Sequence, residues 1–147
     1  MSLRVLGCSG GLSGENQQGS TCIQISESTL IDAGTGLATL SLSEMHRIRH
    51  IFLTHAHMDH IAALPTFLSN QFEQPNLPVK VYGLAETLQR LQRNIFNDEI
   101  WPDFTKAIGS ATAVVELVEL EAGERIEHEG MLIEPFAVQH KIPTVGY

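Results

Sequence analysis

The chain has 147 residues, of which 43% are hydrophobic, and it carries a formal net charge of −8 at pH 7. This length suits one packed unit or one piece of a larger one, and we expect residues 1–147 to form one domain. No apolar run approaches the roughly 20 residues that a membrane span requires, and the acidic balance disfavours broad binding to nucleic acid phosphates. The N-terminus, MSLRVLGCSGG, lacks the pattern of a secretory signal, so a cytoplasmic location is expected.

The first part of the chain predicts a small meander of strands at residues 3–6, 21–25 and 29–31. The Gly- and Ser-rich loop GCSGGLSGENQQGS follows the first strand. It has no G-x-G-x-x-G pattern, and Ser20 stands where a phosphate-binding loop needs lysine, so we interpret it as a flexible or site-bordering loop. Cys8 and Cys22 form no CxxC pair and are expected to be small buried hydrophobic side chains.

Strands and helices alternate in the rest of the chain. Residues 37–48 are predicted to be helical or irregular, and the apolar run 51–53 predicts a buried strand. The spacing of Ile61, Leu64, Leu68 and Phe72 predicts a helix over residues 59–72. A strand at 77–83, a helix at 84–96, a loop at 97–110 and strands within 113–120, 124–138 and 140–147 complete the series. This order predicts an α/β layered architecture with a mixed sheet.

The stretch THAHMDH, directly after the buried strand, is the strongest candidate for chemistry. In an extended segment His55 and His57 project to one side, so they can share a cation, as imidazole nitrogens do for zinc. Asp59 and His60 are offset and can serve a second cation, which in two-metal hydrolases lies roughly 3.5 to 4 Å from the first. A surface loop that is His-rich by chance is the alternative. We favour a metal site because the residue types match metal ligands at the end of a strand.

THAHMDH resembles the H-x-H-x-D-H signature of the metallo-β-lactamase superfamily. LIDAGTG resembles its upstream motif, which implies that Asp32 supports the metal loop without binding a metal. VQHKIPTVGY resembles the segment that supplies the third ligand of the first metal, which implies that His140 joins His55 and His57. Without this context, His140 would be interpreted as a surface residue at a strand end. His46 and His50 are expected to be ordinary surface or interface residues, and His128 a polar hairpin corner.

Two further stretches, MSLRVLGCSGG and RNIFNDEIWPDFT, resemble the class II cyclic-nucleotide phosphodiesterases, whose branch includes the tRNA 3'-processing nucleases. The resemblance implies an αββα sandwich with a mixed sheet, of which this chain corresponds to the N-terminal half. In that family the chain continues after Tyr147 and supplies the Asp that bridges both metals and the last His of the second site. Asn97 and Trp101 are candidates to border the substrate site, although a structural role for their loop is favoured.

The resemblance implies hydrolysis of a 3',5'-cyclic nucleotide to the 5'-monophosphate. Two cations make a bound hydroxide available near neutral pH, and Asp59 orients it while binding the second metal. The ligand chemistry favours zinc, two per complete site, and also accepts manganese or iron. The expected partner is a small anionic phosphodiester, with no membrane, and the acidic composition disfavours nucleic acid.

Three alternatives remain open. A tRNA 3'-processing-type endonuclease would share the metal ligands but would need a basic surface or an RNA-gripping arm. A hydrolase of thioesters or lactones on the same fold would also fit the metal site. In the non-enzyme alternative, the chain is a half-fold that binds metal without catalytic competence, and its exposed sheet edge would favour a homodimer.

Overall fold

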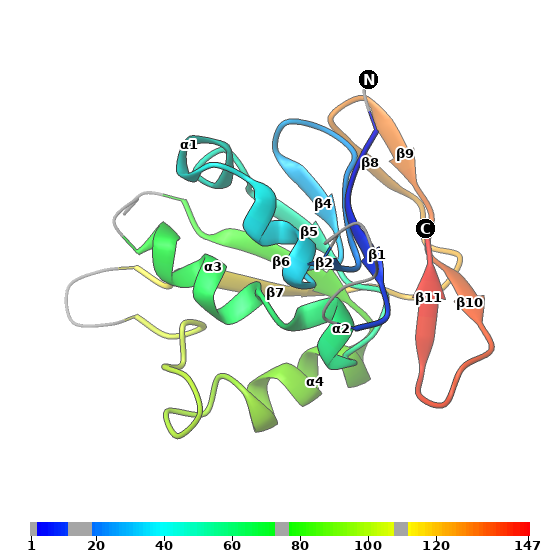
Figure 1. Cartoon of the computed structure of the whole chain (residues 1–147). Coiled ribbons are helices and arrows are strands. Elements are labelled where there is room, and N and C mark those ends of the chain that lie inside the picture. The colour runs from blue at the N-terminus through cyan, green and yellow to red at the C-terminus, as the bar shows by residue number, and fades with distance from the viewer. Residues whose placement is uncertain (1–2, 12–18, 73–76, 108–111) are drawn as a thin grey trace.

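The structure is a computed structural model that describes residues 3–11, 19–72, 77–107 and 112–147 (Figure 1). The glycine-rich loop therefore falls partly on residues 12–18, outside the described residues. The elements follow in the order β1 (Arg4–Ser9), β2 (Gly19–Ser20), β3 (Cys22–Gln24), β4 (Thr29–Ile31), the 3-10 helix η1 (Thr35–Thr39), α1 (Leu42–Met45), β5 (His50–Phe52), α2 (Met58–Ile61), α3 (Leu64–Gln71), β6 (Val79–Gly83), α4 (Ala85–Asn94), β7 (Val115–Glu119), β8 (Ile126–His128), β9 (Met131–Ile133), β10 (Phe136–Val138) and β11 (Thr144–Gly146). The predicted alternation of strands and helices is confirmed.

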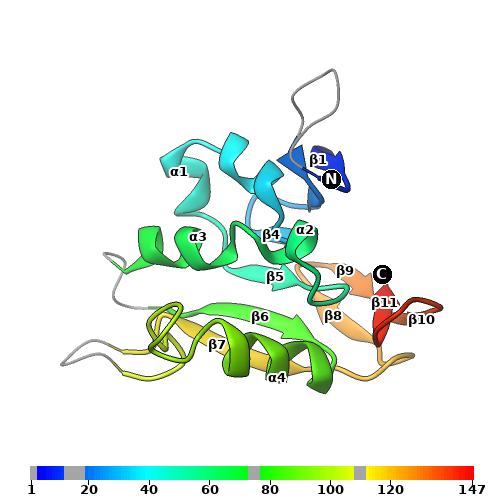
Figure 2. The same ribbon diagram turned by 60° about the horizontal axis from the view of Figure 1, so that its bottom comes forward.

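The main sheet has seven strands in the order β2-β1-β3-β4-β5-β6-β7. The pairs β1–β3 and β3–β4 are antiparallel, whereas β4, β5, β6 and β7 run parallel to one another. The predicted mixed sheet is therefore confirmed. Figure 2 shows β5, β6 and β7 side by side, with α2 beside the end of β5. Because parallel strands end at the same edge, residues that follow β5 lie at the carboxyl edge of this sheet.

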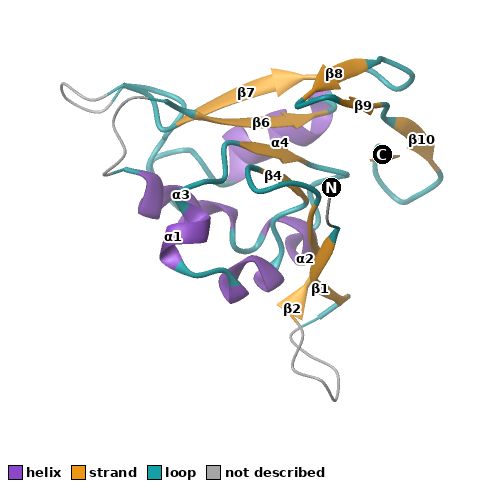
Figure 3. Cartoon of the chain, turned by 90° about the horizontal axis from the view of Figure 1, so that it is seen from above, coloured by secondary structure: helices purple, strands orange, loops and turns teal. Residues whose placement is uncertain are grey.

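The two faces of the sheet carry separate apolar clusters, because successive side chains of a strand point to opposite faces. Ile51 and Val81 belong to the cluster that also contains the buried side chains of α3 and α4. Phe52 and Tyr82 belong to the second cluster, into which the β8–β9 hairpin packs. The rings of Phe52 and Tyr82 stack with their centroids 4.4 Å apart. Figure 3 shows α1 and α3 on one side of the sheet and β9 and β10 on the other.

The single helix predicted over residues 59–72 is wrong, because the structure has two short helices, α2 and α3. The backbone of Ala33 explains the break: its N–H donates to His60 O, and its C=O accepts from Ala63 N. These tertiary bonds take the place of bonds that one helix would make, and α3 then restarts with a proline in its first turn. The new phase buries Phe67 and leaves Phe72 44% exposed.

Three other predictions need correction. Cys22 is buried as expected, but Cys8 is exposed. His50 is not an ordinary surface residue, because it lies inside β5 and its ring is 4.2 Å from that of His128. His128 does end the β8 strand of a hairpin, but its ring turns inward and lies against Phe52. None of the helices in the described part of the chain has the length and apolar character to cross a membrane.

Candidate metal centre

The chain leaves β5 in an extended conformation and enters α2 at Met58. His57 occupies the N-cap position of that helix, with φ −73° and ψ 149°. Asp59 and His60 follow within the helix. The predicted placement of this stretch, on a strand-to-helix loop and the first helical turn, is therefore confirmed.

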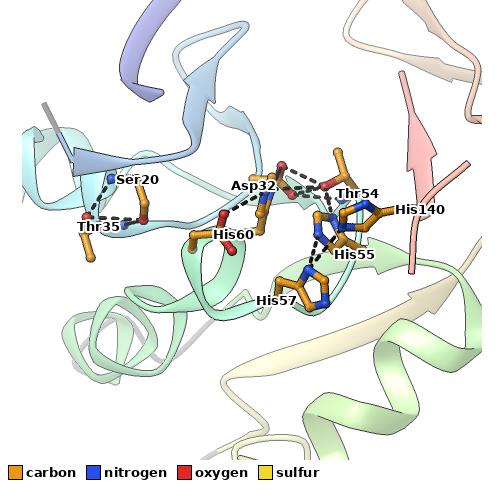
Figure 4. A network of polar contacts seen from close by, with 9 residues as sticks. Ser20, Asp32, Thr35, Thr54, His55, His57, His60 and His140 are labelled. Carbon is orange, nitrogen blue, oxygen red and sulfur yellow. Dashed lines mark hydrogen bonds and ion pairs between the residues drawn. The ribbon is translucent and has the colours of Figure 1, made fainter. Parts of the chain in front are cut away.

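Three histidines converge beside this loop (Figure 4). His57 Nδ1 lies 3.0 Å from His55 Nε2 and 3.2 Å from His140 Nε2, although His140 is 83 residues away in sequence. One nitrogen from each ring lies within 4.8 Å of the other two, a group that could hold a metal ion. His55 is buried, His57 is half-buried and His140 is exposed, so the group opens toward solvent. Converging imidazole nitrogens are a donor set that suits zinc.

Thr54, which the sequence analysis did not single out, fixes which nitrogen of His55 is free. Its hydroxyl has one proton and lies 2.9 and 3.0 Å from the oxygens of Asp32, which accept it. The same hydroxyl is 3.0 Å from His55 Nδ1, so there its oxygen accepts a hydrogen bond from the ring N–H. His55 Nε2 is then unprotonated and faces the other two histidines. A single Thr carries no pattern, and only its position before H-x-H could have indicated this role.

The charge state of His55 also suits a metal ligand. Burial, followed by the neighbouring charges of His60, His57 and His140, lowers the pKa of His55 to about 4. Its imidazole is therefore neutral near pH 7, and the neutral ring is the form that binds a metal.

Asp59 and His60 lie next to this group without being part of it. His60 Nδ1 is 2.7 Å from Asp32 Oδ2, and because a carboxylate only accepts, this nitrogen donates. Burial opposes the charged ring, but the hydrogen bond to Asp32 and the charges of Asp32 and Asp59 raise the pKa of His60. His60 Nε2 faces Asp59 Oδ2 at 3.5 Å, so two ligand-type atoms adjoin the histidine group.

Asp32 is buried at the end of β4, with a positive φ of 60°. Its Oδ1 accepts from the backbone N–H of Thr54 at 2.8 Å, and its own N–H donates to Phe52 O. These bonds, with that to His60, join β4 to the loop that carries the histidines. The arrangement is what a residue supporting the metal loop would make, and the role itself stays a prediction.

The β10–β11 hairpin brings His140 to the cluster. Its strands pair antiparallel, and His140 lies in the connection between them. Two bonds fix β11 against the exit of β5: Val145 N donates to Thr54 O at 3.1 Å, and Tyr147 Oη donates to Leu53 O at 2.9 Å. The position of His140 therefore depends on the contacts of Val145 and Tyr147, which are not among the three converging histidines.

Asn97 and Trp101 are not brought to the histidines. They lie in the loop after α4, where Asn97 accepts backbone bonds and Trp101 packs against the helix-side core. The same loop ends at Phe104, whose backbone C=O accepts from Val114 and Val115 at the start of β7. This is the amino edge of the parallel strands, at the end of α4 away from α2 (Figure 1). His55 and His57 follow β5 and so lie at the carboxyl edge. The structure therefore gives no support to the candidacy of Asn97 and Trp101 as borders of the substrate site.

Comparison with known proteins identifies the family. Residues 28–146 match a family described as the beta-lactamase superfamily domain. The chain therefore belongs to the metallo-β-lactamase superfamily, and it has the α/β fold with a mixed sheet that the resemblance implied.

Individual relatives are distant and fall into two groups. The chain is 42% identical over 59 residues to 3',5'-cyclic-nucleotide phosphodiesterase 1 of Saccharomyces cerevisiae, covering 40% of this chain and 16% of that protein. It is 28% identical over 123 residues to ribonuclease Z of Staphylococcus carnosus, covering 80% of this chain and 37% of that protein. The crystal structure of unliganded yeast PDE1 superposes with a TM-score of 0.74 at 18% identity, covering 97% of this chain and 59% of that one. The chain thus spans less than two thirds of the length of these proteins.

Proposed function

We propose that this chain contributes the first metal site of a metal-dependent phosphodiesterase that hydrolyses a 3',5'-cyclic nucleotide to the 5'-monophosphate. The observation that carries the proposal is the convergence of three histidine nitrogens, from two distant segments, within 4.8 Å of one another. Membership of the metallo-β-lactamase superfamily supports a hydrolytic reaction.

The residues of the site would divide the work as follows. His55, His57 and His140 would hold one cation, and Asp59 with His60 would contribute to a second. Zinc fits this donor set, and manganese or iron remains an alternative. When bound, such cations lower the pKa of a coordinated water to near 7 and so supply a nucleophile at neutral pH.

The remaining steps belong to the side chains themselves. The carboxylate of Asp59 is about one third exposed, so its oxygens can accept a proton from the attacking water and orient it toward the phosphorus. Thr54 and the buried Asp32 hold the rings of His55 and His60 in fixed tautomers, with Nδ1 protonated and Nε2 facing the site. Ring positions that do not need to reorganise lower the barrier to reaction.

Cyclic nucleotides are favoured as substrate by the match to the yeast phosphodiesterase, which is the more identical of the two relatives. The acidic composition, with 9 Lys and Arg against 17 Asp and Glu, also argues against a surface that grips RNA. The second candidate is endonucleolytic processing of RNA. The observation that favours it is the ribonuclease Z match, which extends over 80% of this chain.

Metal content tests the site directly. We expect the chain, purified without added metal, to retain at least one equivalent of metal by elemental analysis, and His57→Ala to lose it. His46→Ala is the matched control, because His46 bonds to Asn70 O and takes no part in the cluster. Equal metal content in the two variants would contradict the assignment.

Substrate class is tested on metal-loaded protein with cyclic AMP and with a tRNA precursor in parallel. Formation of 5'-AMP, abolished in His57→Ala and retained in His46→Ala, is the expected result. Cleavage of the precursor alone would favour the second candidate, and hydrolysis of neither by metal-loaded chain would contradict both for this chain.

A further inference from the structure

A cavity of about 310 Å³ adjoins the site on the side of Asp59. The described residues of its lining follow β1, belong to β2 and η1, or lie in and just after α2: Gly10, Gly11, Ser20, Thr35, Met58, Asp59 and Ala62. None of the three converging histidines is among these residues. The cavity is therefore a space next to the candidate metal centre that the proposed metal ligands, apart from Asp59, do not use.

Two residues of the lining, Ser20 and Thr35, are joined by reciprocal hydrogen bonds between the hydroxyl of one and the backbone N–H of the other. Ser20 Oγ accepts from Thr35 N at 2.8 Å, and Thr35 Oγ1 accepts from Ser20 N at 2.7 Å (Figure 4). Gly34 lets the two segments approach α2, since a Cβ there would lie 2.3 Å from Asp59 O and 2.5 Å from Ser20 Oγ. Because these polar groups already bond to one another, this part of the lining offers few free partners to a ligand.

The walls are apolar and open. Met58 stands between His57 and Asp59, lines the cavity and is 60% exposed. At Gly10 and Gly11 a Cβ would meet no atom of the described part of the chain within 4 Å, so these two residues leave space beside the cavity. Among the described residues of this lining Asp59 is the one that is charged, and its carboxylate disfavours an anion at that point.

These features select an uncharged, flat ligand group. A thioether makes favourable contacts with aromatic rings, and ligand cavities range upward from about 300 Å³. The phosphate of a substrate would lie at the histidines, and the part that extends toward Met58 would be the one without charge. In a nucleoside phosphodiester that part is the base.

We propose that the cavity binds the nucleobase of the substrate, with Met58 against the ring and Gly10 and Gly11 leaving the space it occupies. This inference rests on the proposed function, because it takes the substrate to be a nucleoside phosphodiester. The chemistry is shared by a cyclic nucleotide and by one nucleotide of an RNA.

The test follows the methyl groups of methionine by NMR in the full chain labelled with 13C-methyl methionine. Adenosine is the probe, because it has the base and lacks a phosphodiester, so its binding does not depend on hydrolysis. Titration should shift the Met58 resonance, saturably, and leave those of Met45 and Met131 in place. Met45 packs against the helix-side cluster and Met131 against the cluster on the opposite face, so both serve as internal controls.

A blocking variant makes the test specific. Gly10 is exposed and lines the cavity, and a Cβ there would meet no atom of the described residues within 4 Å, so we expect Gly10→Leu to retain the fold and to narrow the cavity. We expect it to raise the apparent Kd for adenosine about tenfold or more. Ala38→Leu, on the exposed side of η1 and outside the lining, should bind adenosine as the wild type does.

Two results would overturn the proposal: no selective shift of Met58 at saturating adenosine, or an unchanged shift in Gly10→Leu. Separate titrations with cyclic AMP and with the dinucleotide ApA then distinguish the two sources of the base. The favoured source is the ligand that saturates the Met58 shift at the lower concentration. Adenosine binding without any hydrolysis would support the cavity and contradict the proposed function. Hydrolysis without a Met58 response would do the reverse.

Discussion

At the scale of single residues, the buried carboxylate of Asp32 links the loop before His55 to His60. It accepts from the backbone and hydroxyl of Thr54 and from His60 Nδ1. An amide in its place would present an N–H to His60 Nδ1, so the ring would move its proton to Nε2, the atom that faces Asp59. Replacing one carboxylate oxygen of Asp32 by an amide nitrogen would thus remove the lone pair on His60 Nε2 with which that ring would bind the second cation.

We expect Asp32→Asn to lower the free energy of unfolding by about 1.5 to 3 kcal/mol, the range for a hydrogen bond to a charged group. It should also weaken metal binding about 10- to 100-fold, as loss of a residue behind a metal ligand does. Urea unfolding and metal titration measure the two effects. Asp98→Asn is the control, because Asp98 also has a positive φ, 64°, but is exposed. Equal losses in both variants would show that the buried contacts of Asp32 contribute no more than the exposed bond of Asp98, whose Oδ1 accepts from Asp103 N.

The two cysteines should differ in reactivity. Burial, and next the charge of Asp32, raises the pKa of Cys22 to about 12, so its thiolate is scarce at neutral pH. Cys8 is exposed. Iodoacetamide at pH 7.5 should add one group to the native chain, at Cys8, and two after denaturation, as mass spectrometry would report. Modification of Cys22 in the native protein would show that the apolar cluster it shares with the buried side chains of α3 and α4 opens.

At the scale of elements, β11 determines where His140 lies. Tyr147 bonds to Leu53 O and its ring lies against Phe52, with centroids 5.5 Å apart. Tyr82 is the matched comparison, because its ring also stacks on Phe52 but its hydroxyl bonds to His50 and not to the histidine-bearing loop.

We therefore expect Tyr147→Phe and Tyr82→Phe to lose similar stability, each about 1 kcal/mol, the usual value of one hydrogen bond. Metal affinity should fall only in Tyr147→Phe, because only there does the lost bond join β11 to the exit of β5. Calorimetric titration with zinc measures this difference. Unchanged affinity in Tyr147→Phe would mean that Val145 alone positions the hairpin.

The short helix α1 owes its start to a capping box in which Ser41 and Glu44 bond to each other's backbone N–H. Glu44 also accepts from Arg4 of β1 at 2.7 Å. The bonds to the Ser41 backbone and side chain, and then the contact with Arg4, lower the pKa of Glu44 to about 2 from 4.5.

Since the pKa is lower in the folded state, the stabilisation by Glu44 is present above about pH 4.5 and is lost as the pH falls toward 2. The thermal midpoint of the wild type should therefore fall more steeply over this interval than that of Glu44→Gln. Parallel curves for the two proteins would show that the capping carboxylate contributes nothing to the pH dependence.

At the scale of the whole molecule, local patterns predicted the sheet and half of the site. The apolar run at Ile51 and the alternation of Val79 and Val81 are properties of neighbouring residues, and so is the shared direction of His55 and His57. His140 is different, because nothing in its surroundings marks it as a ligand, and only the resemblance of its segment to a family identified it.

The remaining features could not be predicted because distant backbone atoms determine them. The break between α2 and α3 is made by Ala33, about thirty residues away, whereas Ala62 and Ala63 are good helix formers and signal no break. The cavity beside Asp59 could not be predicted because Gly10 and Gly11 contribute to it by lacking a side chain. The resemblance of the loop around Trp101 indicated a branch of the family but could not indicate to which edge of the sheet the loop belongs.

The separation of 83 residues between His57 and His140 has a consequence for assembly. In the unfolded chain, His55 and His57 are neighbours and can hold a cation weakly, whereas the third nitrogen joins them only when the β10–β11 hairpin lies against the exit of β5. A cation held by all three histidines would join the two ends of that long loop and so act as a crosslink. Folding has already brought these ends together, so the entropy of loop closure is not lost again when the cation binds. Tight metal capture would then be a late event, available only to chains that have completed the sheet, and a chelator would remove a constraint on the fold as well as a reactant.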